Sequence, residues 1–288
     1  MRVVFWNVAV GGDRRLGLLE RLDADVLLLA EVSPASARSW TQRWQGRYHC
    51  AAGLELIGSE QQRPRGAMIA SRWPLTAPRV VAGLPRPERG LIAETSHPAG
   101  PLALLAWSAP NAAGDGRQAK QQGYAAVTAE LAALPAPVIA GVDTNTWEDT
   151  PLGSPPPEDD PDWAPEQQFI RRNPPHGLRD VQRAVIDADR ARSDLIAAVR
   201  PHGPLAVTYI RRPHHQPRRI VDRQGIAWGL DRMDRLYASP DITIEACENF
   251  DHEAIDAGSD HALIAADLTI TRTENLAAAD ATQPPATH

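Results

Sequence analysis

The stretch PVIAGVDTNTW, residues 137–147, is the part of the chain from which the fold and the chemistry are best inferred. Its apolar run, residues 138–140, follows two prolines and predicts a buried strand. Gly141, after that run, suits a turn or a close backbone approach. Asp143 and Asn145 stand two residues apart, so in extended chain their side chains project the same way.

This pair of polar side chains allows two interpretations. In open α/β sheets ligands bind at strand ends, where a carboxylate can take a proton or a hard metal and an amide can hydrogen-bond an oxygen. The alternative is an Asx turn that closes the strand. Both interpretations stay open until the rest of the chain is considered.

The composition excludes several classes of protein. The 288 residues suit one large domain or two small ones, and a hydrophobic content of 43% is ample for a core. The net charge of −6 provides no overall basic field, so any phosphate recognition must be local. Cys50 and Cys247 form neither a metal-ligand spacing nor a disulfide framework. We find no signal-peptide segment and no apolar run near ~18 residues, and we expect a soluble cytoplasmic protein without a membrane span.

Hydrophobic patterning predicts strands that outnumber helices. We expect strands at residues 2–8, 25–30, 66–72, 90–96, 101–107, 205–210, 241–247 and 262–270, besides the opening stretch. We expect helices near residues 14–22 (capped by Asp13), 34–44, 117–134 and 188–199. A Pro-rich acidic segment, residues 149–176, predicts a long surface loop. Such a pattern favours stacked sheets with helices outside.

Polar residues recur at the ends of the apolar strands, where one face of a sheet would gather them. They are Asn7, Glu31, Asp143, Asn145, Asp234, Asp260 and His261. Carboxylate and amide oxygens make a hard site that suits Mg²⁺ or Mn²⁺. The histidine could hydrogen-bond or protonate a phosphoryl oxygen while an aspartate orients it. The chemistry indicated is metal-assisted attack of water on phosphorus.

Six short motifs in this order resemble the endonuclease/exonuclease/phosphatase superfamily, which includes apurinic endonucleases, pancreatic-type deoxyribonucleases, sphingomyelinases and inositol polyphosphate 5-phosphatases. The motifs are Phe5-Trp6-Asn7, residues 25–31, Arg65-Gly66-Ala67 with Ser71-Arg72, residues 141–145, residues 232–236, and Ser259-Asp260-His261. The resemblance implies a four-layer α/β sandwich of two packed mixed sheets flanked by helices. It implies one domain over residues 1–271, with 149–176 as a loop insertion and 272–288 as a disordered tail.

The resemblance also implies a metal site and a catalytic group. Glu31 resembles the main metal ligand, Asn7 lies beside it, and Asp260 resembles a second acid near the metal, which would be Mg²⁺ or Mn²⁺. Asp143 resembles the group that activates water.

Three further residues complete the catalytic group that the resemblance implies. Asn145 resembles the group that holds water or phosphate. His261 resembles the phosphate-binding histidine, and Asp234 resembles its orienting carboxylate.

One position departs from the family pattern. Family members usually carry a Tyr or His, which touches the scissile phosphate, in the strand before the long loop. Here either Trp107 or Ser108 stands there, depending on a one-residue shift in alignment. Neither is an imidazole or a phenol, although Ser108 can donate a hydrogen bond. Asn111 matches the Pro-Asn of apurinic endonucleases.

We expect from these features a nuclease that hydrolyses phosphodiester bonds. Residues 211–223 hold five arginines, of which Arg218 and Arg219 are candidate phosphate contacts. One alternative is a phosphatase or phosphodiesterase for a small molecule or lipid head group, which the net acidity favours. Another is a catalytically weakened binding protein, which Trp107 or Ser108 suggests.

Overall fold

The structure is a computed structural model that describes residues 1–58, 62–135, 137–146, 165–199, 205–206, 208–210 and 230–270. Arg218 and Arg219, the expected tail 272–288 and residues 149–164 of the expected insertion lie outside these ranges. Within the part of the chain that the structure describes, no helix is both long and apolar enough to cross a membrane.

The first sheet has six strands in the order β13-β14-β1-β2-β4-β3. Its strands are β1 (Arg2–Val10), β2 (Val26–Val32), β3 (His49–Ala52), β4 (Gly66–Ser71), β13 (Ile242–Phe250) and β14 (Leu263–Ile270). The central pair β1 and β2 is parallel, and every other neighbouring pair is antiparallel. The sheet is therefore mixed.

The second sheet repeats this plan in the order β5-β6-β7-β8-β12-β9. Its strands are β5 (Leu75–Val80), β6 (Gly90–His97), β7 (Gly100–Ser108), β8 (Val138–Asp143), β9 (Arg179–Asp180) and β12 (Asp234–Ala238). Again one central pair, β7 and β8, is parallel and the others are antiparallel. The antiparallel pair β10 (Tyr209–Ile210) and β11 (Leu230–Asp231) forms a separate two-stranded sheet.

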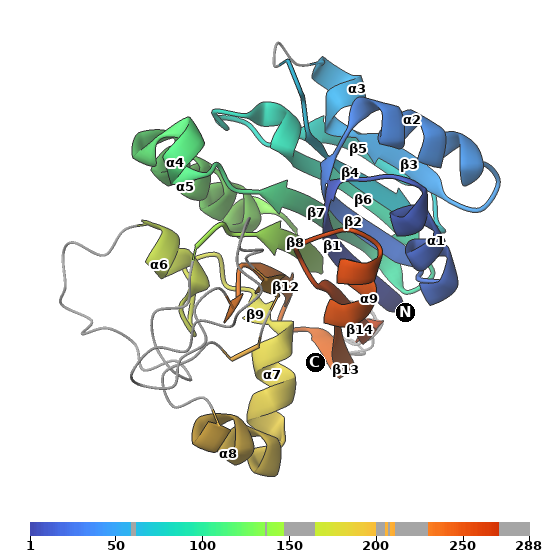
Figure 1. The fold of residues 1–288 in the computed structure, drawn as a ribbon. Helices are drawn as coiled ribbons and strands as arrows, with labels where there is room; N and C mark the ends of the chain where they lie inside the picture. Colours follow the sequence, from blue (N-terminus) through green and yellow to red (C-terminus); the bar gives the residue numbers. More distant parts are fainter. Residues whose placement is uncertain are drawn as a thin grey trace, which may run out of the picture.

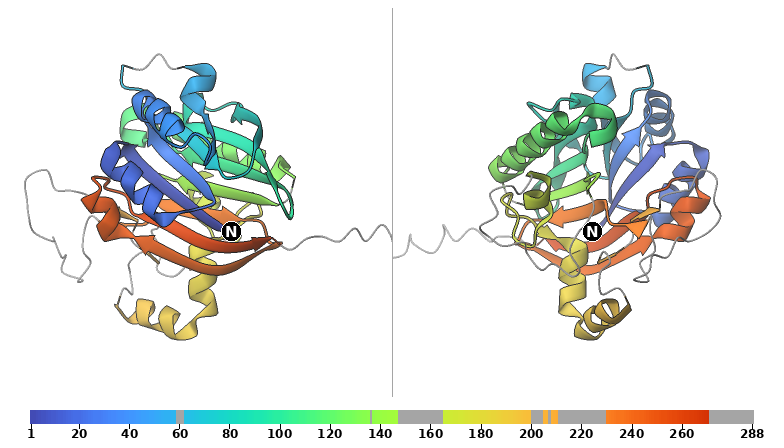
Figure 2. Two further views of the ribbon diagram at one scale, coloured as in Figure 1. Left: turned by 90° about the vertical axis from the view of Figure 1, so that its right-hand side faces the viewer. Right: turned by 60° about the vertical axis from the view of Figure 1, so that its left-hand side comes forward.

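Helices cover the outer faces of the two sheets (Figures 1 and 2). Helices α1 (Asp13–Leu22), α2 (Pro34–Arg43) and α9 (Asp251–Asp256) pack on the first sheet. Helices α5 (Arg117–Ala133) and α6 (Pro165–Ile170) pack on the second. The remaining helices are α3 (Gly53–Ile57), η1 (Pro87–Arg89), α4 (Ala112–Asp115), α7 (Val181–Ala188) and α8 (Arg190–Val199). The predicted four-layer α/β sandwich is confirmed.

Side-chain alternation along the strands divides the core into three apolar layers. In β1, Val3 and Phe5 pack between the sheets, whereas Val4 and Trp6 pack under the outer helices. Strands buried on both faces need apolar residues at nearly every position, which is why they read as continuous apolar runs. The runs at residues 2–8, 25–30 and 138–142 were predictable for this reason.

The structure corrects several predicted elements. The expected loop 149–176 is not all loop, because residues 165–170 form α6 and Phe169 is fully buried among aromatic rings. Asp13 is the first helical residue and not a cap, since Gly12 occupies the N-cap position. The helix expected at 188–199 is α8 (Arg190–Val199), whereas α7 (Val181–Ala188) just before it was not predicted. The strand expected at 205–210 is limited to Tyr209–Ile210 among the described residues.

Several edge strands and short helices were missed, among them β3, β5 and α3. Strand β5 is largely exposed and contains Pro78, and β3 has no β-branched residue. Helix α3 has only five residues, too few for a helical period to be visible. Edge strands and short helices bury few side chains, so their sequences carry little hydrophobic pattern.

Gly141 lies inside β8, so the expected turn is wrong and the expected close approach is confirmed. A Cβ at this position would lie 2.2 Å from Cδ2 of Phe5 and 3.0 Å from Cβ of Leu28. Glycine is therefore required for the two sheets to pack closely here.

We expect Gly141→Ala to destabilise the fold by about 1–3 kcal/mol, because the added methyl overpacks a fully buried layer. The measurement is the free energy of unfolding in urea. Gly114→Ala is the matched control, since a Cβ at Gly114 meets nothing within 4 Å. Equal stability of the two variants would contradict the close packing at Gly141.

Candidate active site

The polar residues of the candidate site lie on the inner faces of the two sheets, at the ends of rows of apolar side chains. Along β1 the inward row runs from Val3 and Phe5 to Asn7, and along β8 it runs from Ile139 to Asp143. At the carboxyl ends of the two parallel pairs, polar residues thus replace apolar ones. Asp234 begins β12, which runs antiparallel to β8, so it stands opposite Asp143 in the register.

Asp143 is fully buried and is held by several donors. Its Oδ2 accepts hydrogen bonds from Asn7 Nδ2 (2.8 Å) and Ser108 Oγ (3.0 Å). Its Oδ1 accepts one from the backbone amide of Asn145 (3.0 Å). The side-chain amide of Asn145 also donates to Oδ2, at 3.3 Å. This set of donors fixes the orientation of the carboxylate.

Asn145 adopts a left-handed backbone conformation with φ of 45°. Asparagine tolerates this conformation better than most residues. Its side-chain amide donates to Ala109 O at 2.8 Å, which ties the end of β8 to the loop after β7. The two interpretations of Asp143 and Asn145 therefore coexist: the pair forms an Asx-type contact and also lies within the candidate site.

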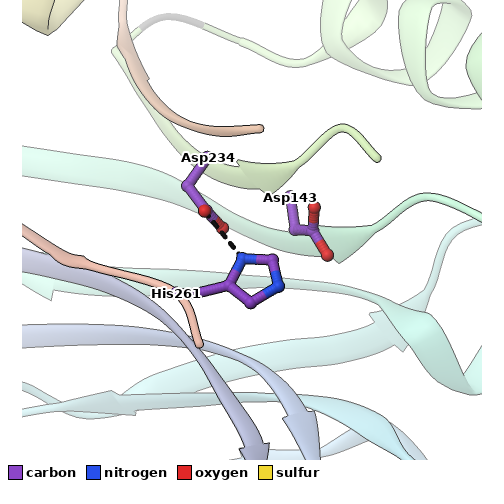
Figure 3. Close-up of side chains that lie close together, drawn as sticks. All are labelled: Asp143, Asp234 and His261. Atoms are coloured by element: carbon purple, nitrogen blue, oxygen red, sulfur yellow. Dashed lines mark hydrogen bonds and ion pairs between the residues drawn. The ribbon is translucent and has the colours of Figure 1, made fainter. Parts of the chain in front are cut away.

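His261 and Asp234 form a buried pair in which Nδ1 of the imidazole lies 2.7 Å from Oδ2 of the carboxylate (Figure 3). Burial disfavours the imidazolium, but Asp234, Asp143 and Asp260 outweigh this effect and raise the pKa of His261 to about 10. Burial also raises the pKa of Asp234 to about 6, against the lowering effect of His261. Near neutral pH the pair is therefore an imidazolium and a carboxylate.

The backbone around His261 is fixed by the first sheet. Trp6 Nε1 donates to His261 O (2.9 Å), and Ser259 Oγ accepts from the His261 amide (3.1 Å) while donating to Asn7 O (2.8 Å). The ring of Tyr209 lies against the imidazole, with the ring centroids 4.9 Å apart.

Asp143, Asp234 and His261 each offer a ligand atom, and these atoms all lie within 4.8 Å of one another. In Figure 3 the second ring nitrogen of His261 lies on the side of Asp143. Since Nδ1 of His261 is engaged by Asp234, Nε2 is the ring atom that can face a phosphoryl oxygen. Among the described residues, neither Glu31 nor Asp260 belongs to this group.

Glu31 has a φ of 56°, at a register shift between β2 and β4. Its side chain is 16% exposed, and its carboxylate forms an ion pair with Arg65. Strained conformations of this kind cluster at functional sites, although the strain alone does not identify a role. Asp260 is partly buried and immediately precedes His261.

Strand alternation places the side chains of Trp107 and Ser108 on opposite faces of β7. Trp107 points to the outer face of the second sheet and packs against Tyr124 and Phe169. Ser108 points inward and donates to Asp143. Asn111 is exposed, and its backbone amide donates to Asp115 Oδ2.

The sequence matches the Endonuclease/Exonuclease/phosphatase family over residues 4–261. The chain belongs to this family. A search of curated proteins finds no match to this sequence.

Solved structures of family proteins share the fold. D. rerio TDP2 in complex with a single-strand DNA product is 17% identical, with a TM-score of 0.63, over 93% of this chain and 98% of that one. An AP endonuclease from Archaeoglobus fulgidus is 16% identical, with a TM-score of 0.63, over 94% and 100%. The Xenopus laevis APE2 catalytic domain is 16% identical, with a TM-score of 0.62, over 95% and 94%.

Some residues that build the family site were not identified from the sequence. Thr208 Oγ1 accepts from the amides of Met233 and Asp234 (2.9 and 2.8 Å) and so fixes the start of β12. Lys120 donates to the carbonyl of Asn145. A sequence signal existed for Lys120, since it occupies the same helical face as Tyr124 and Val127 although it is charged.

Proposed function

We propose that this member of the endonuclease/exonuclease/phosphatase family is a divalent-metal-dependent phosphoesterase, and that it hydrolyses phosphodiester bonds of nucleic acid. The observation that carries the proposal is the buried His261–Asp234 pair beside Asp143. The imidazolium of His261, the carboxylate of Asp143 and the amide of Asn145 lie close together. Such groups can promote the attack of water on a phosphoryl group.

In the proposed reaction, Nε2 of His261 donates a hydrogen bond to a phosphoryl oxygen while Asp234 keeps Nδ1 protonated and the ring oriented. Asp143 accepts the proton of the attacking water, whose oxygen bonds to phosphorus as the ester P–O bond breaks. The leaving oxygen takes its proton from solvent. Asn145 and Ser108 help to hold the water or the phosphate. These groups are positioned before substrate binds, because each is already held by neighbouring residues.

We propose Glu31, Asn7 and Asp260 as the ligands of Mg²⁺ or Mn²⁺. The family generally uses divalent metals, and carboxylate and amide oxygens are hard donors that fit such ions. Asn7 Oδ1 accepts from the Ala9 amide (3.0 Å) and keeps a second lone pair for a metal. Arg65 supplies the positive charge that now balances Glu31. When bound, the cation would neutralise negative charge on the phosphate.

Nucleic acid is supported as the substrate by the DNA-bound TDP2 structure and by the AP endonuclease among the similar folds. Asn111, Arg218 and Arg219 remain proposed substrate contacts, and the cytoplasmic location and the single domain 1–271 stay predictions. The net charge of −6 favours the alternative, a small phosphoester or lipid head group.

The proposed function is tested by incubating the purified protein with Mg²⁺ or Mn²⁺ against plasmid, abasic duplex, RNA and small phosphoesters. We expect cleavage of at least one polynucleotide and loss of that cleavage in EDTA. Hydrolysis of small phosphoesters alone would favour the alternative. No hydrolysis of any substrate would favour a binding protein of the same fold.

A further inference from the structure

Lys120 occupies a position in α5 where an apolar residue would be expected. It precedes Tyr124, Val127 and Leu131 on the helix face that packs on the second sheet. Its side chain is buried, with a relative exposure of 7%. Lysine is almost never buried to this extent unless its ammonium has partners, so the partners of Lys120 indicate why the charge is retained.

The ammonium of Lys120 reaches the loop that follows β8. Nζ donates to the backbone carbonyl of Asn145 at 2.6 Å. Burial lowers the pKa of Lys120, while the nearby carboxylates of Glu166 and Asp143 act in the opposite direction. The ammonium of Lys120 therefore lies near α6, which carries Glu166, and near Asp143 of the candidate active site.

Asn145, whose carbonyl Lys120 binds, has a left-handed backbone conformation and helps to orient the carboxylate of Asp143. The amide of Asn145 binds Asp143 Oδ1, and its side chain binds Ala109 O and Asp143 Oδ2. Lys120 holds the backbone carbonyl of this residue. Without that bond the peptide after Asn145 would lose the contact that keeps its carbonyl directed into the protein.

The neighbouring residues of the loop are held in the same way. Tyr124 donates to the carbonyl of Thr144, and Arg235 Nη1 donates to Thr144 Oγ1 (2.8 Å). Tyr124 is also an aromatic core residue and Arg235 is fully buried, so replacing either would disturb packing as well. Lys120 is the member of this set whose polar contact can be removed while an unbranched apolar stem is retained.

We propose that Lys120 is a positioning residue, which holds Asn145 in its left-handed conformation and so aligns Asp143 and Asn145 for the reaction. This inference rests on the proposed phosphoesterase function for its kinetic consequence. Its structural consequence, an ordered loop at residues 143–146, does not depend on that function.

The test compares Lys120→Met, which keeps the stem, with Lys120→Arg, which keeps a charged donor. Gln122→Met is the matched control, because Gln122 also donates from α5 to a backbone carbonyl, that of Gly83, but is exposed. Each variant is assayed for kcat and KM on the best substrate, for melting temperature, and for amide hydrogen exchange at residues 143–146.

We expect Lys120→Met to lower kcat about 10–100-fold with KM changed less than about twofold, because misplacement of catalytic groups costs turnover more than binding. Hydrogen exchange at residues 143–146 should accelerate in this variant. The melting temperature should change little, since removal of a desolvated ammonium offsets the hydrogen bond lost by the Asn145 carbonyl. Lys120→Arg should recover most of the lost kcat, and Gln122→Met should resemble wild type throughout.

Unchanged kcat and unchanged exchange in Lys120→Met would overturn the inference. A loss of kcat in Lys120→Met that is explained by a loss of stability would also overturn it. The same holds if Lys120→Arg loses as much kcat as Lys120→Met. If wild-type protein hydrolyses no substrate, the proposed function fails instead, and the exchange comparison alone decides whether Lys120 orders the loop.

Discussion

Replacing Asp143 by Asn should lower kcat by about 10²–10⁴-fold, and replacing His261 by Gln should lower it by a similar factor. Asp143 is the acceptor proposed for the proton of the attacking water, and an amide cannot accept that proton. His261 provides the cationic donor that faces the phosphoryl oxygen. The double variant should be little worse than either single variant, since residues that act as one unit are not additive.

The measurement is kcat in Mg²⁺ on the best substrate, with unfolding curves to establish that each variant is folded. Ser71→Ala is a suitable control, because it breaks another buried polar contact, Ser71 Oγ to Thr95 Oγ1 at 3.0 Å, which lies outside the candidate site. It should leave kcat unchanged. Losses that multiply in the double variant would mean that Asp143 and His261 act independently.

Removal of the metal and replacement of Glu31, its main proposed ligand, should each abolish turnover. Glu31→Gln keeps the size of the side chain but removes the charge that holds a hard cation. We expect activity to collapse in EDTA and in Glu31→Gln, with added Mg²⁺ or Mn²⁺ restoring the wild type only. Direct Mn²⁺ binding, measured by calorimetry, should be weakened at least about tenfold in the variant.

The control for this charge change is Glu55→Gln, which alters an exposed acid on α3. It should leave both activity and Mn²⁺ affinity as in the wild type. Hydrolysis that continues undiminished in EDTA would contradict metal dependence. Normal Mn²⁺ affinity in Glu31→Gln would instead mean that other groups, such as the Asp143–Asp234–His261 cluster, bind the ion.

Much of the fold was predictable because its central strands are buried on both faces. Their apolar runs end at polar residues, and those ends were recognisable one strand at a time. The edge strands β3 and β5 were not, since one side of each lacks a neighbour and the apolar pattern weakens. Phe169 was missed because it is the one aromatic residue of the short polar helix α6, and only the packing of distant rings buries it.

The candidate residues themselves were also largely predictable, but their contacts were not. Asn7, Asp143, Asp234 and His261 were identified from their positions at strand ends, and the structure brings all four together. Asn111 was predicted to bind substrate, and the described contacts leave it at the surface.

By itself the sequence determined the central strands, the polar residues at their ends and the family, because apolar runs and short motifs are local properties of the chain. Tertiary structure alone decided that Ser108 and not Trp107 faces Asp143, because that choice depends on which face of β7 meets the other sheet. It also decided that Lys120 reaches Asn145, since the two residues come together only when α5 packs on the second sheet. Contacts between residues far apart in the chain depend on the register and packing of whole elements, and no local pattern contains that information.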